Sequence, residues 1–278
     1  MSAAAQVAQT VPLLQNLDAV RQRLSTAAHV GLFVDFDGAL SRIVPLPHDA
    51  KLEPGIRTTL EMLATRPDFT IAIVSGRALR DVRARVGVEN IIYVGNHGLE
   101  IESERICFRE PQAEALRLEL RSLALQLKLA LCDTEGLEIE DKALTLSVHF
   151  RNVAEELRDW VRNVTCGIIT RSRSFQCREG KMVLEVYPRI DWNKVRAIKW
   201  IAREVLPFSA LRIYLGDDSA DEEAFLAIRD GITIRVGDLS DTAARYSLPD
   251  VASVGVFLQW LDRTKPNASR ANSQRAGK

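Results

Sequence analysis

The sequence predicts an α/β protein, built on a doubly wound, Rossmann-like parallel sheet with an inserted α+β domain. Three short apolar runs, within residues 29–40, 69–77 and 211–228, each lead through a polar loop or turn into a helix-like segment. Such runs indicate strands buried on both faces of a parallel sheet. Residues 105–187 instead alternate between apolar and polar side chains, which is typical of an antiparallel sheet with one open face. Strand–loop–helix repeats around such a segment favour a doubly wound core with an insertion.

The elements follow in order along the chain. After the first strand and a proline-rich loop, the apolar spacing predicts a helix over residues 54–66. The second strand leads into a helix over 78–87, and the third runs directly into a helix within 211–228. The insertion is expected to contain helices at 110–131 and 153–165, with alternating strands at 136–152 and 166–188.

These elements predict a division of the chain into domains. We expect a partly disordered N-terminal extension and a disordered tail on either side of a core that is interrupted by the insertion. The expected bounds are 1–28 for the extension, 29–104 and 188–263 for the core, 105–187 for the insertion and 264–278 for the tail.

Composition excludes several classes of protein. The chain has 37 Lys and Arg residues against 37 Asp and Glu residues, so a nucleic-acid partner, which favours basic surfaces, is not expected. No apolar stretch approaches the roughly 20 residues of a membrane span. The N-terminus lacks the pattern of a signal peptide, so a cytoplasmic location is expected. The four cysteines show no metal-ligand spacing. No heptad seam demands a partner chain, and we expect a monomer.

The densest chemistry lies in the segment Asp35-Phe36-Asp37-Gly38. Residues two apart on a strand point to the same side, so both carboxylates can face one site where the first strand ends. In open α/β sheets ligands bind at the carboxyl ends of the strands. The alternative is a solvated turn, because Asp and Gly are common in turns.

A second acidic cluster, Gly216 to Glu223, follows the third strand. One carboxylate would be enough to cap the following helix. Asp217, Asp218 and Asp221 in one turn repel each other, and a hard divalent cation shared with Asp35 would relieve that repulsion. Mg²⁺ suits such a site because it takes a few carboxylates and leaves positions for water and phosphate oxygens.

Two further features favour a phosphate ligand. Ser75 and Arg77 end the second strand, where a hydroxyl and the following helix terminus can bind an anion. Lys194, which follows Pro188, can neutralise phosphate charge. Taken singly, Ser75 is more typical of a helix cap and Lys194 of a surface lysine.

The order of these motifs resembles the haloacid dehalogenase superfamily of phosphohydrolases. Over residues 29–262 the chain resembles the trehalose-6-phosphate phosphatases within it. The matching segments are FVDFDGALSRIVPLPHDA, IAIVSGR, VGNHGLEI, IEDKALTLSVHFR, EGKMVLEVYP, WNK and YLGDDSADEEAF. The resemblance implies a haloacid-dehalogenase core with an inserted α+β cap domain. It also implies a hydrolase that releases phosphate from trehalose 6-phosphate, a small-molecule sugar phosphate.

The resemblance also implies catalytic roles. Asp35 would be the nucleophile that becomes an aspartyl-phosphate, and Asp37 the general acid and base. Ser75 and Lys194 would bind the transferring phosphoryl group, and Arg77 would order the site or reach the sugar. The implied cofactor is Mg²⁺, held by Asp35, Asp217 and the backbone carbonyl of Asp37, with Asp218 and Asp221 in support.

The insertion would then be the cap that covers the sugar. The resemblance assigns disaccharide binding to four charged residues, and such groups suit a ligand made of hydroxyls. They are Glu140, Lys142, Lys181 and Glu185. Without the resemblance, each would be read as part of a solvated strand face.

Three departures from the family pattern stand at Ala39, Val195 and Ala220, where Thr, Gly and Thr are usual. Losing a hydroxyl near the phosphate would slow the enzyme without abolishing its chemistry. The acidic residues are all present, which favours an active enzyme. Two alternatives stay open: a phosphatase for another sugar phosphate, and a sugar-phosphate-binding pseudophosphatase with weak or no turnover.

Overall fold

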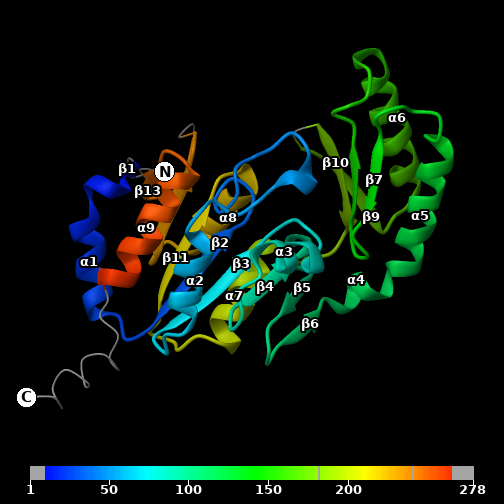
Figure 1. Ribbon diagram of the computed structural model, residues 1–278. Coiled ribbons are helices and arrows are strands. Elements are labelled where there is room, and N and C mark those ends of the chain that lie inside the picture. Colours follow the sequence, from blue (N-terminus) through cyan, green and yellow to red (C-terminus); the bar gives the residue numbers. More distant parts are fainter. Residues whose placement is uncertain (1–9, 181, 239–240, 265–278) are drawn as a thin grey trace, which may run out of the picture. The chain divides into compact units, whose positions relative to one another are not determined.

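The computed structural model describes residues 10–180, 182–238 and 241–264 (Figure 1). The chain forms two compact units. One, here called the core unit, comprises Met1–Cys107 and Asn193–Lys278, and the other, the insertion unit, comprises Phe108–Trp192. Each unit has its own hydrophobic core.

The core unit is built on a nine-stranded sheet in the order β1-β13-β12-β11-β2-β3-β4-β5-β6, whose last strand, β6, continues past Cys107 into the insertion unit. From β1 to β4 all neighbouring strands pair in parallel, and β5 pairs antiparallel to β4. The α/β fold predicted from the sequence is confirmed. In sheet order the strands are β1 (Val11–Pro12), β13 (Tyr246–Leu248), β12 (Ile232–Val236), β11 (Leu211–Gly216), β2 (Val30–Asp35), β3 (Phe69–Val74), β4 (Ile92–Gly95), β5 (Glu100–Glu102) and β6 (Cys107–Arg109).

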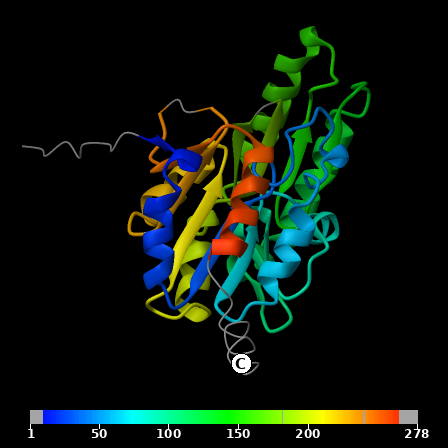
Figure 2. The same ribbon diagram turned by 60° about the vertical axis from the view of Figure 1, so that its left-hand side comes forward.

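Helices cover both faces of this sheet, as the fully buried central strands require. Figure 2 shows α1 and α9 crossing one face, and apolar residues of these helices join those of α2, α3 and the strands in a single cluster. The helices of the core unit are α1 (Leu17–Thr26), α2 (Ile56–Ala64), α3 (Leu79–Val86), α7 (Lys194–Glu204), α8 (Ser219–Ala227) and α9 (Val251–Thr264), with short 3₁₀ turns η1 (Leu13–Gln15), η2 (Pro47–Asp49) and η3 (Asn96–Gly98).

The N-terminal segment belongs to the core unit more fully than the sequence suggested. Residues 10–12 belong to the extension that was expected to be partly disordered, but Val11 and Pro12 form β1, which adds an edge strand to β13. The side chains of Leu13, Val20 and Leu24 are buried in the main cluster. A two-residue strand is too short to leave a periodic signal, which is why it escaped prediction. Of the extension 1–28 and the tail 264–278, residues 1–9 and 265–278 lie outside the described residues, and Thr264 is the last residue of α9.

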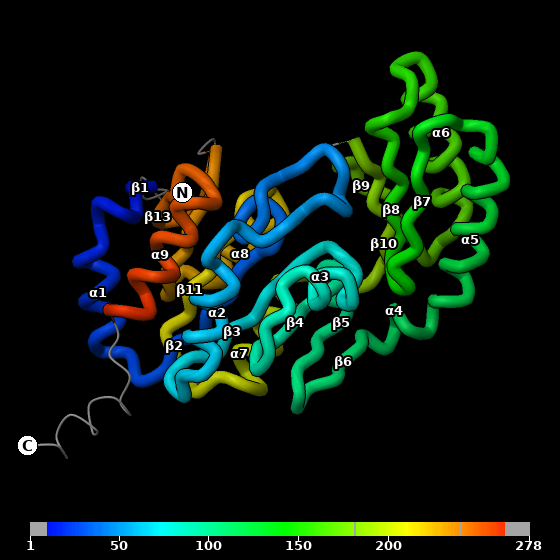
Figure 3. The backbone as a smooth tube through the Cα atoms, in the orientation of Figure 1, coloured from blue at the N-terminus to red at the C-terminus, as the bar shows by residue number. Residues whose placement is uncertain are grey.

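The insertion unit is a four-stranded antiparallel sheet with helices on one face (Figure 3). Leu146, Val148, Leu184 and Val186 pack toward the helices, and the residues that alternate with them form the open face. The sheet order is β7 (Glu138–Asp141), β8 (Leu146–His149), β10 (Val183–Pro188) and β9 (Phe175–Gly180), and the helices are α4 (Pro111–Ala115), α5 (Arg117–Ala130) and α6 (Glu155–Arg171).

The strand region predicted over residues 166–188 begins later than expected. Residues 166–171 were predicted to be extended, but they form the last turns of α6. Val161, Thr165 and Ile169 are all buried at a spacing of four, so the helical period continues through residues whose β-branched side chains favour strands. The helix predicted over 110–131 is broken at Leu116 into α4 and α5.

Among the residues described, no helix combines the length and apolar character needed to cross a bilayer.

Candidate active site

The candidate site begins where adjacent parallel strands of the core unit end. In the sheet β2 lies between β11 and β3, and Asp35, the last residue of β2, pairs in register with Val74 of β3. Ser75 and Asp217 directly follow β3 and β11. The carboxyl ends of the three strands therefore bring these residues to one edge of the sheet, the usual place for ligands in such folds.

A buried lysine joins the two acidic motifs. Lys194 opens α7 and is only 6% exposed, and its Nζ donates to Oδ1 of Asp35 and to Oδ1 of Asp221, both at 2.7 Å. The two carboxylates raise the pKa of Lys194 well above its usual value, although burial alone would lower it. This lysine is therefore a charged group of the site, and the surface position considered for it is wrong.

The helix that follows Asp217 is anchored by Asp221. Asp218 caps α8 by accepting from the N–H of Asp221 at 3.1 Å, and Oδ2 of Asp221 accepts from the N–H groups of Asp217 and Asp218 at 2.9 and 3.2 Å. The two side chains form a capping box, which satisfies amides that the helix itself leaves unpaired. Tyr214 donates its hydroxyl to Oδ1 of Asp221 at 2.6 Å.

Three carboxylates converge closely enough to share a cation. One oxygen each of Asp35, Asp217 and Asp221 lies within 4.8 Å of the others. Burial raises the pKa of Asp35 well above its ordinary value, against the opposing charge of Lys194. Burial, followed by repulsion from Asp218 and Asp221, raises the pKa of Asp217 to about 7. A divalent ion would supply the positive charge that these carboxylates lack, so the oxygen-rich cluster fits Mg²⁺.

Gly38 makes room for this cluster. Its φ of +77° lies in the left-handed region, and a Cβ on it would overlap the carboxylate of Asp217. Glycine is therefore needed at this position for two reasons, the turn after β2 and the close approach of Asp217.

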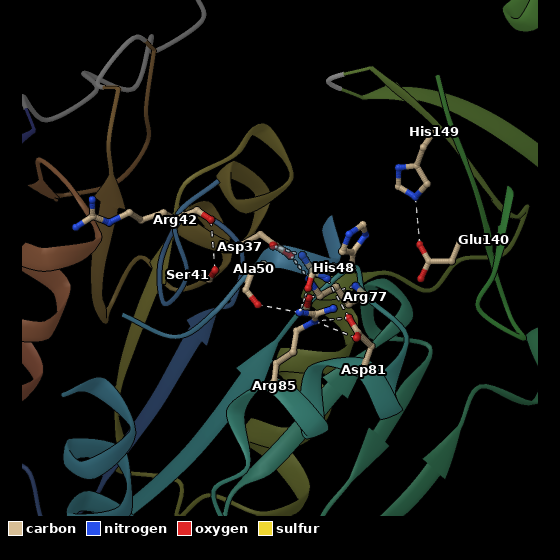
Figure 4. A network of polar contacts seen from close by, with 11 residues as sticks. Asp37, Ser41, Arg42, His48, Ala50, Arg77, Asp81, Arg85, Glu140 and His149 are labelled. Carbon is tan, nitrogen blue, oxygen red and sulfur yellow. Dashed lines mark hydrogen bonds and ion pairs between the residues drawn. The ribbon is translucent and has the colours of Figure 1, made fainter. Parts of the chain in front are cut away.

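Asp37 lies in a second network, formed with Arg77 and Asp81 (Figure 4). Nε and Nη2 of Arg77 donate to the two oxygens of Asp37 at 2.8 and 2.7 Å, and Nη1 donates to Asp81 at 3.0 Å. Burial would lower the pKa of Arg77, but these two carboxylates outweigh it and raise that pKa. The Asp37 side chain is still 43% exposed, so a ligand can reach it. Asp81 and Arg85, which extend the network, were not singled out from the sequence.

Ser75 is buried at 1% exposure, and its Oγ accepts from the N–H of Arg77 at 3.1 Å. The turn Gly95–Gly98 (GNHG) holds this loop, because the N–H of Asn96 donates to the carbonyl of Arg77 and that of His97 to the carbonyl of Ser75. Gly98 in turn packs against the carbonyl of Asn193, the residue before Lys194. The turn thus links the loop after β3 to the start of α7.

The predicted sugar-binding residues gather on the open face of the insertion sheet. Glu140, Ser147 and Glu185 lie side by side in register on β7, β8 and β10. Glu185 accepts from Ser147 at 2.9 Å and from Lys142 at 3.2 Å. Lys181 lies outside the described residues. Ser147 was missed from the sequence, although its position on an alternating strand places it on the polar face.

His149 lies on the same face, 3.2 Å from Oε2 of Glu140 (Figure 4). The hydrogen bond from His149 lowers the pKa of Glu140, against burial, which would raise it. Glu140 is thereby held as a carboxylate that can accept from ligand hydroxyl groups.

The three departures from the family pattern differ in their surroundings. Ala39 is fully buried and belongs to the main apolar cluster. Val195 and Ala220 are partly exposed in the first turns of α7 and α8. Ala39 is therefore part of the packing beneath the site.

Comparison with known proteins supports one family. A model of the trehalose-phosphatase family matches residues 33–252. A trehalose-phosphate phosphatase of Mycobacterium leprae is 36% identical in an alignment 263 residues long, which covers 88% of this chain and 60% of that relative. The chain thus spans about 60% of the length of the curated trehalose-phosphate phosphatases that it matches.

Solved structures show the same fold. The structure of a trehalose-6-phosphate phosphatase related protein superposes with a TM-score of 0.75 at 24% identity, covering 84% of this chain and 97% of that one. The C-terminal domain of a trehalose-6-phosphate phosphatase from C. albicans gives a TM-score of 0.74 at 20% identity, covering 92% and 99%. With the family match over most of its length, the chain belongs to the trehalose-phosphatase family.

Proposed function

We propose that this protein is a phosphomonoester hydrolase that cleaves trehalose 6-phosphate into trehalose and phosphate, through an aspartyl-phosphate on Asp35. The observation that carries the proposal is the contact of Lys194 with Asp35 beside Asp217, in a chain of the trehalose-phosphatase family. This arrangement combines a nucleophile with positive charge at the point where phosphoryl transfer needs both.

In the first step Asp35 attacks phosphorus. Lys194 holds Oδ1 of Asp35, and we assign the attack to Oδ2. The Oδ2–P bond forms as the bond from phosphorus to the sugar oxygen breaks, and Asp37 gives its proton to that oxygen. Lys194 and the hydroxyl of Ser75 stabilise the charge on the transferring group.

In the second step a water molecule displaces Asp35 from phosphorus. Asp37, now a carboxylate, takes a proton from a water molecule as that water attacks phosphorus. The Oδ2–P bond breaks, phosphate leaves and Asp35 is restored. Both oxygens of Asp37 accept from Arg77, so Asp37 must give up at least one of these hydrogen bonds and take up a proton from solvent before the acid step.

The proposed cofactor is Mg²⁺, held by carboxylates of Asp35 and Asp217 with the backbone carbonyl of Asp37. When bound, the ion would neutralise charge on the phosphoryl oxygens. Asp218 and Asp221 would support it through their capping box and through the hydrogen bond that the N–H of Asp217 donates to Oδ2 of Asp221.

The open face of the insertion sheet is the proposed reader of the disaccharide. Glu140 and Glu185 offer acceptors to sugar hydroxyls, and Lys142 and Lys181 offer donors. Arg77 is assigned to ordering Asp37, which is its partner in the structure. The proposed partner is thus a small sugar phosphate, and we propose a monomeric cytoplasmic enzyme.

The test is phosphate release from trehalose 6-phosphate by purified protein, with Mg²⁺ or with EDTA. We expect fast release with Mg²⁺ and none with EDTA. Sucrose 6-phosphate, glucose 6-phosphate and p-nitrophenyl phosphate serve as comparison esters. Equal rates on all four would remove the case for trehalose and favour a broad phosphatase. Tight binding of the sugar phosphate without release would favour a pseudophosphatase.

A further inference from the structure

The buried hydroxyl of Tyr214 is hydrogen-bonded to the acidic site. Tyr214, on β11, is fully buried, and its hydroxyl donates to Oδ1 of Asp221 at 2.6 Å. Its ring packs edge-on against Phe225 of α8, with ring centroids 5.7 Å apart. A phenylalanine would supply the same packing, so the hydroxyl needs a separate explanation. A hydroxyl is costly to bury unless it makes a useful hydrogen bond.

The partner of this hydroxyl, Asp221, connects several groups of the site. Oδ1 of Asp221 accepts from Tyr214 and from Lys194, and Oδ2 accepts from the N–H groups of Asp217 and Asp218. Both oxygens thus receive two donors each, which satisfies a carboxylate. Gly216 closes the remaining side, since a Cβ there would overlap the carboxylate of Asp221. Asp221 therefore has one rotamer that serves all four donors.

We propose that Tyr214 is a positioning residue that locks this rotamer of Asp221, and through it fixes both Lys194 and the backbone that presents Asp217. The inference rests on the proposed function for its effect on turnover. Without the hydroxyl, Asp221 keeps Lys194 and the two amides but can rotate about its side chain. Lys194 then shifts relative to Asp35, and the loop carrying Asp217 loosens. A displacement of this kind slows the chemical step more than it weakens binding of the sugar.

The variant Tyr214→Phe removes only the hydroxyl, and Tyr93→Phe is its matched control. Tyr93 is 3% exposed on β4 of the same sheet, and its hydroxyl accepts from the N–H of Val88 at 3.0 Å and donates to its carbonyl at 2.7 Å. Both variants lose a bonded, buried hydroxyl. Of these two hydroxyls, that of Tyr214 is bonded to the acidic site and that of Tyr93 is not.

Two readouts test the proposal. On trehalose 6-phosphate with Mg²⁺, we expect kcat of Tyr214→Phe to fall about tenfold with KM changed less than about twofold, as suits a lost hydrogen bond to a charged group. Tyr93→Phe should keep the wild-type kcat. Amide hydrogen exchange, measured without substrate, should be about tenfold faster at Asp217 and Asp218 in Tyr214→Phe alone, since their hydrogen bonds to Asp221 open more often.

The outcomes separate the inference from the proposed function. Faster exchange in a protein that never releases phosphate would support the positioning role and refute the phosphatase. Unchanged exchange and kcat in a folded Tyr214→Phe protein would overturn the positioning role. An equal loss of kcat in both variants, or failure of Tyr214→Phe alone to fold, would also overturn it, because the hydroxyl would then serve stability.

Discussion

Replacing Gly38 by alanine tests whether the close approach of Asp217 organises the site. At a φ of +77° an alanine pays a backbone cost, about 1–2 kcal/mol. The new Cβ would also overlap the carboxylate of Asp217 and lie 2.7 Å from its Oδ1, well inside an ordinary contact. Because Gly38 is held by the turn after β2, the carboxylate has to move, by at least about 1 Å, to reach ordinary contact distance. A misplacement of about 1 Å can lower turnover about 100-fold.

Gly55→Ala is the matched control for the backbone cost. Gly55 has a φ of +83°, and among the described residues a Cβ on it would meet only Nε2 of Gln259, at an ordinary 3.7 Å. Both variants should therefore lose similar stability from the backbone, and only Gly38→Ala should disturb the acidic cluster. The measurements are urea unfolding, calorimetric titration with Mg²⁺ and phosphate release from trehalose 6-phosphate.

The expected result is specific to the site. Gly38→Ala should bind Mg²⁺ about 10- to 100-fold more weakly and lose about 100-fold in kcat, while Gly55→Ala keeps both. If Gly38→Ala binds Mg²⁺ and turns over like Gly55→Ala, the contact between Gly38 and Asp217 does not shape the site, and the reasoning fails.

Three further perturbations probe separate parts of the molecule. Asp35→Asn should lower phosphate release at least ~1,000-fold and leave unfolding nearly unchanged, because Lys194 keeps Asp221; near-normal turnover would mean that the nucleophile is another residue. Glu185→Ala should raise KM for trehalose 6-phosphate about tenfold and spare p-nitrophenyl phosphate, since only the sugar needs that hydrogen bond; equal losses on both esters would place Glu185 in the catalytic centre or in folding. Burial would raise the pKa of Asp81, but hydrogen bonds from Arg85 and Arg77 outweigh it and lower that pKa. The ionised side chain therefore adds to the free energy of unfolding in full above the unfolded pKa of about 4, and this contribution disappears as pH falls through the lower folded pKa. Asp81→Asn should thus destabilise by ~1 kcal/mol at pH 7, after solvent screening, and progressively less below pH ~4 in urea unfolding; a difference independent of pH would contradict an ionic contribution.

The proximity of Asp35, Ser75 and Asp217 could be predicted because it follows from the order of the parallel strands in the sheet. Neighbouring parallel strands end at one edge, so residues directly after such strands meet whatever their side-chain rotamers. The pairing of Asp37 with Arg77 could not be predicted in this way. It depends on which of several nearby groups a flexible side chain selects, and the sequence equally allowed Arg77 to reach a sugar.

Other features left no usable signal. Tyr214 sits in an apolar strand and has the appearance of an ordinary core residue, so its bond to Asp221 could not be recognised. Residues 166–171 carry β-branched side chains that suggest a strand, but burial of one helical stripe overrides that preference. The sequence suggested that Ala39 removes a hydroxyl from the phosphate site. In the structure Ala39 belongs to the apolar core, where side-chain volume is the first constraint.

The division of the chain has a consequence for how such an enzyme can diversify. Every member of the acidic cluster and Lys194 lies outside Phe108–Trp192, and the proposed sugar-reading carboxylates lie within it. One continuous exchange between Cys107 and Asn193 would therefore replace the proposed sugar-reading carboxylates and leave every residue proposed for the phosphate chemistry unchanged. On the proposed roles, selection for a new sugar phosphate can act on Phe108–Trp192 alone.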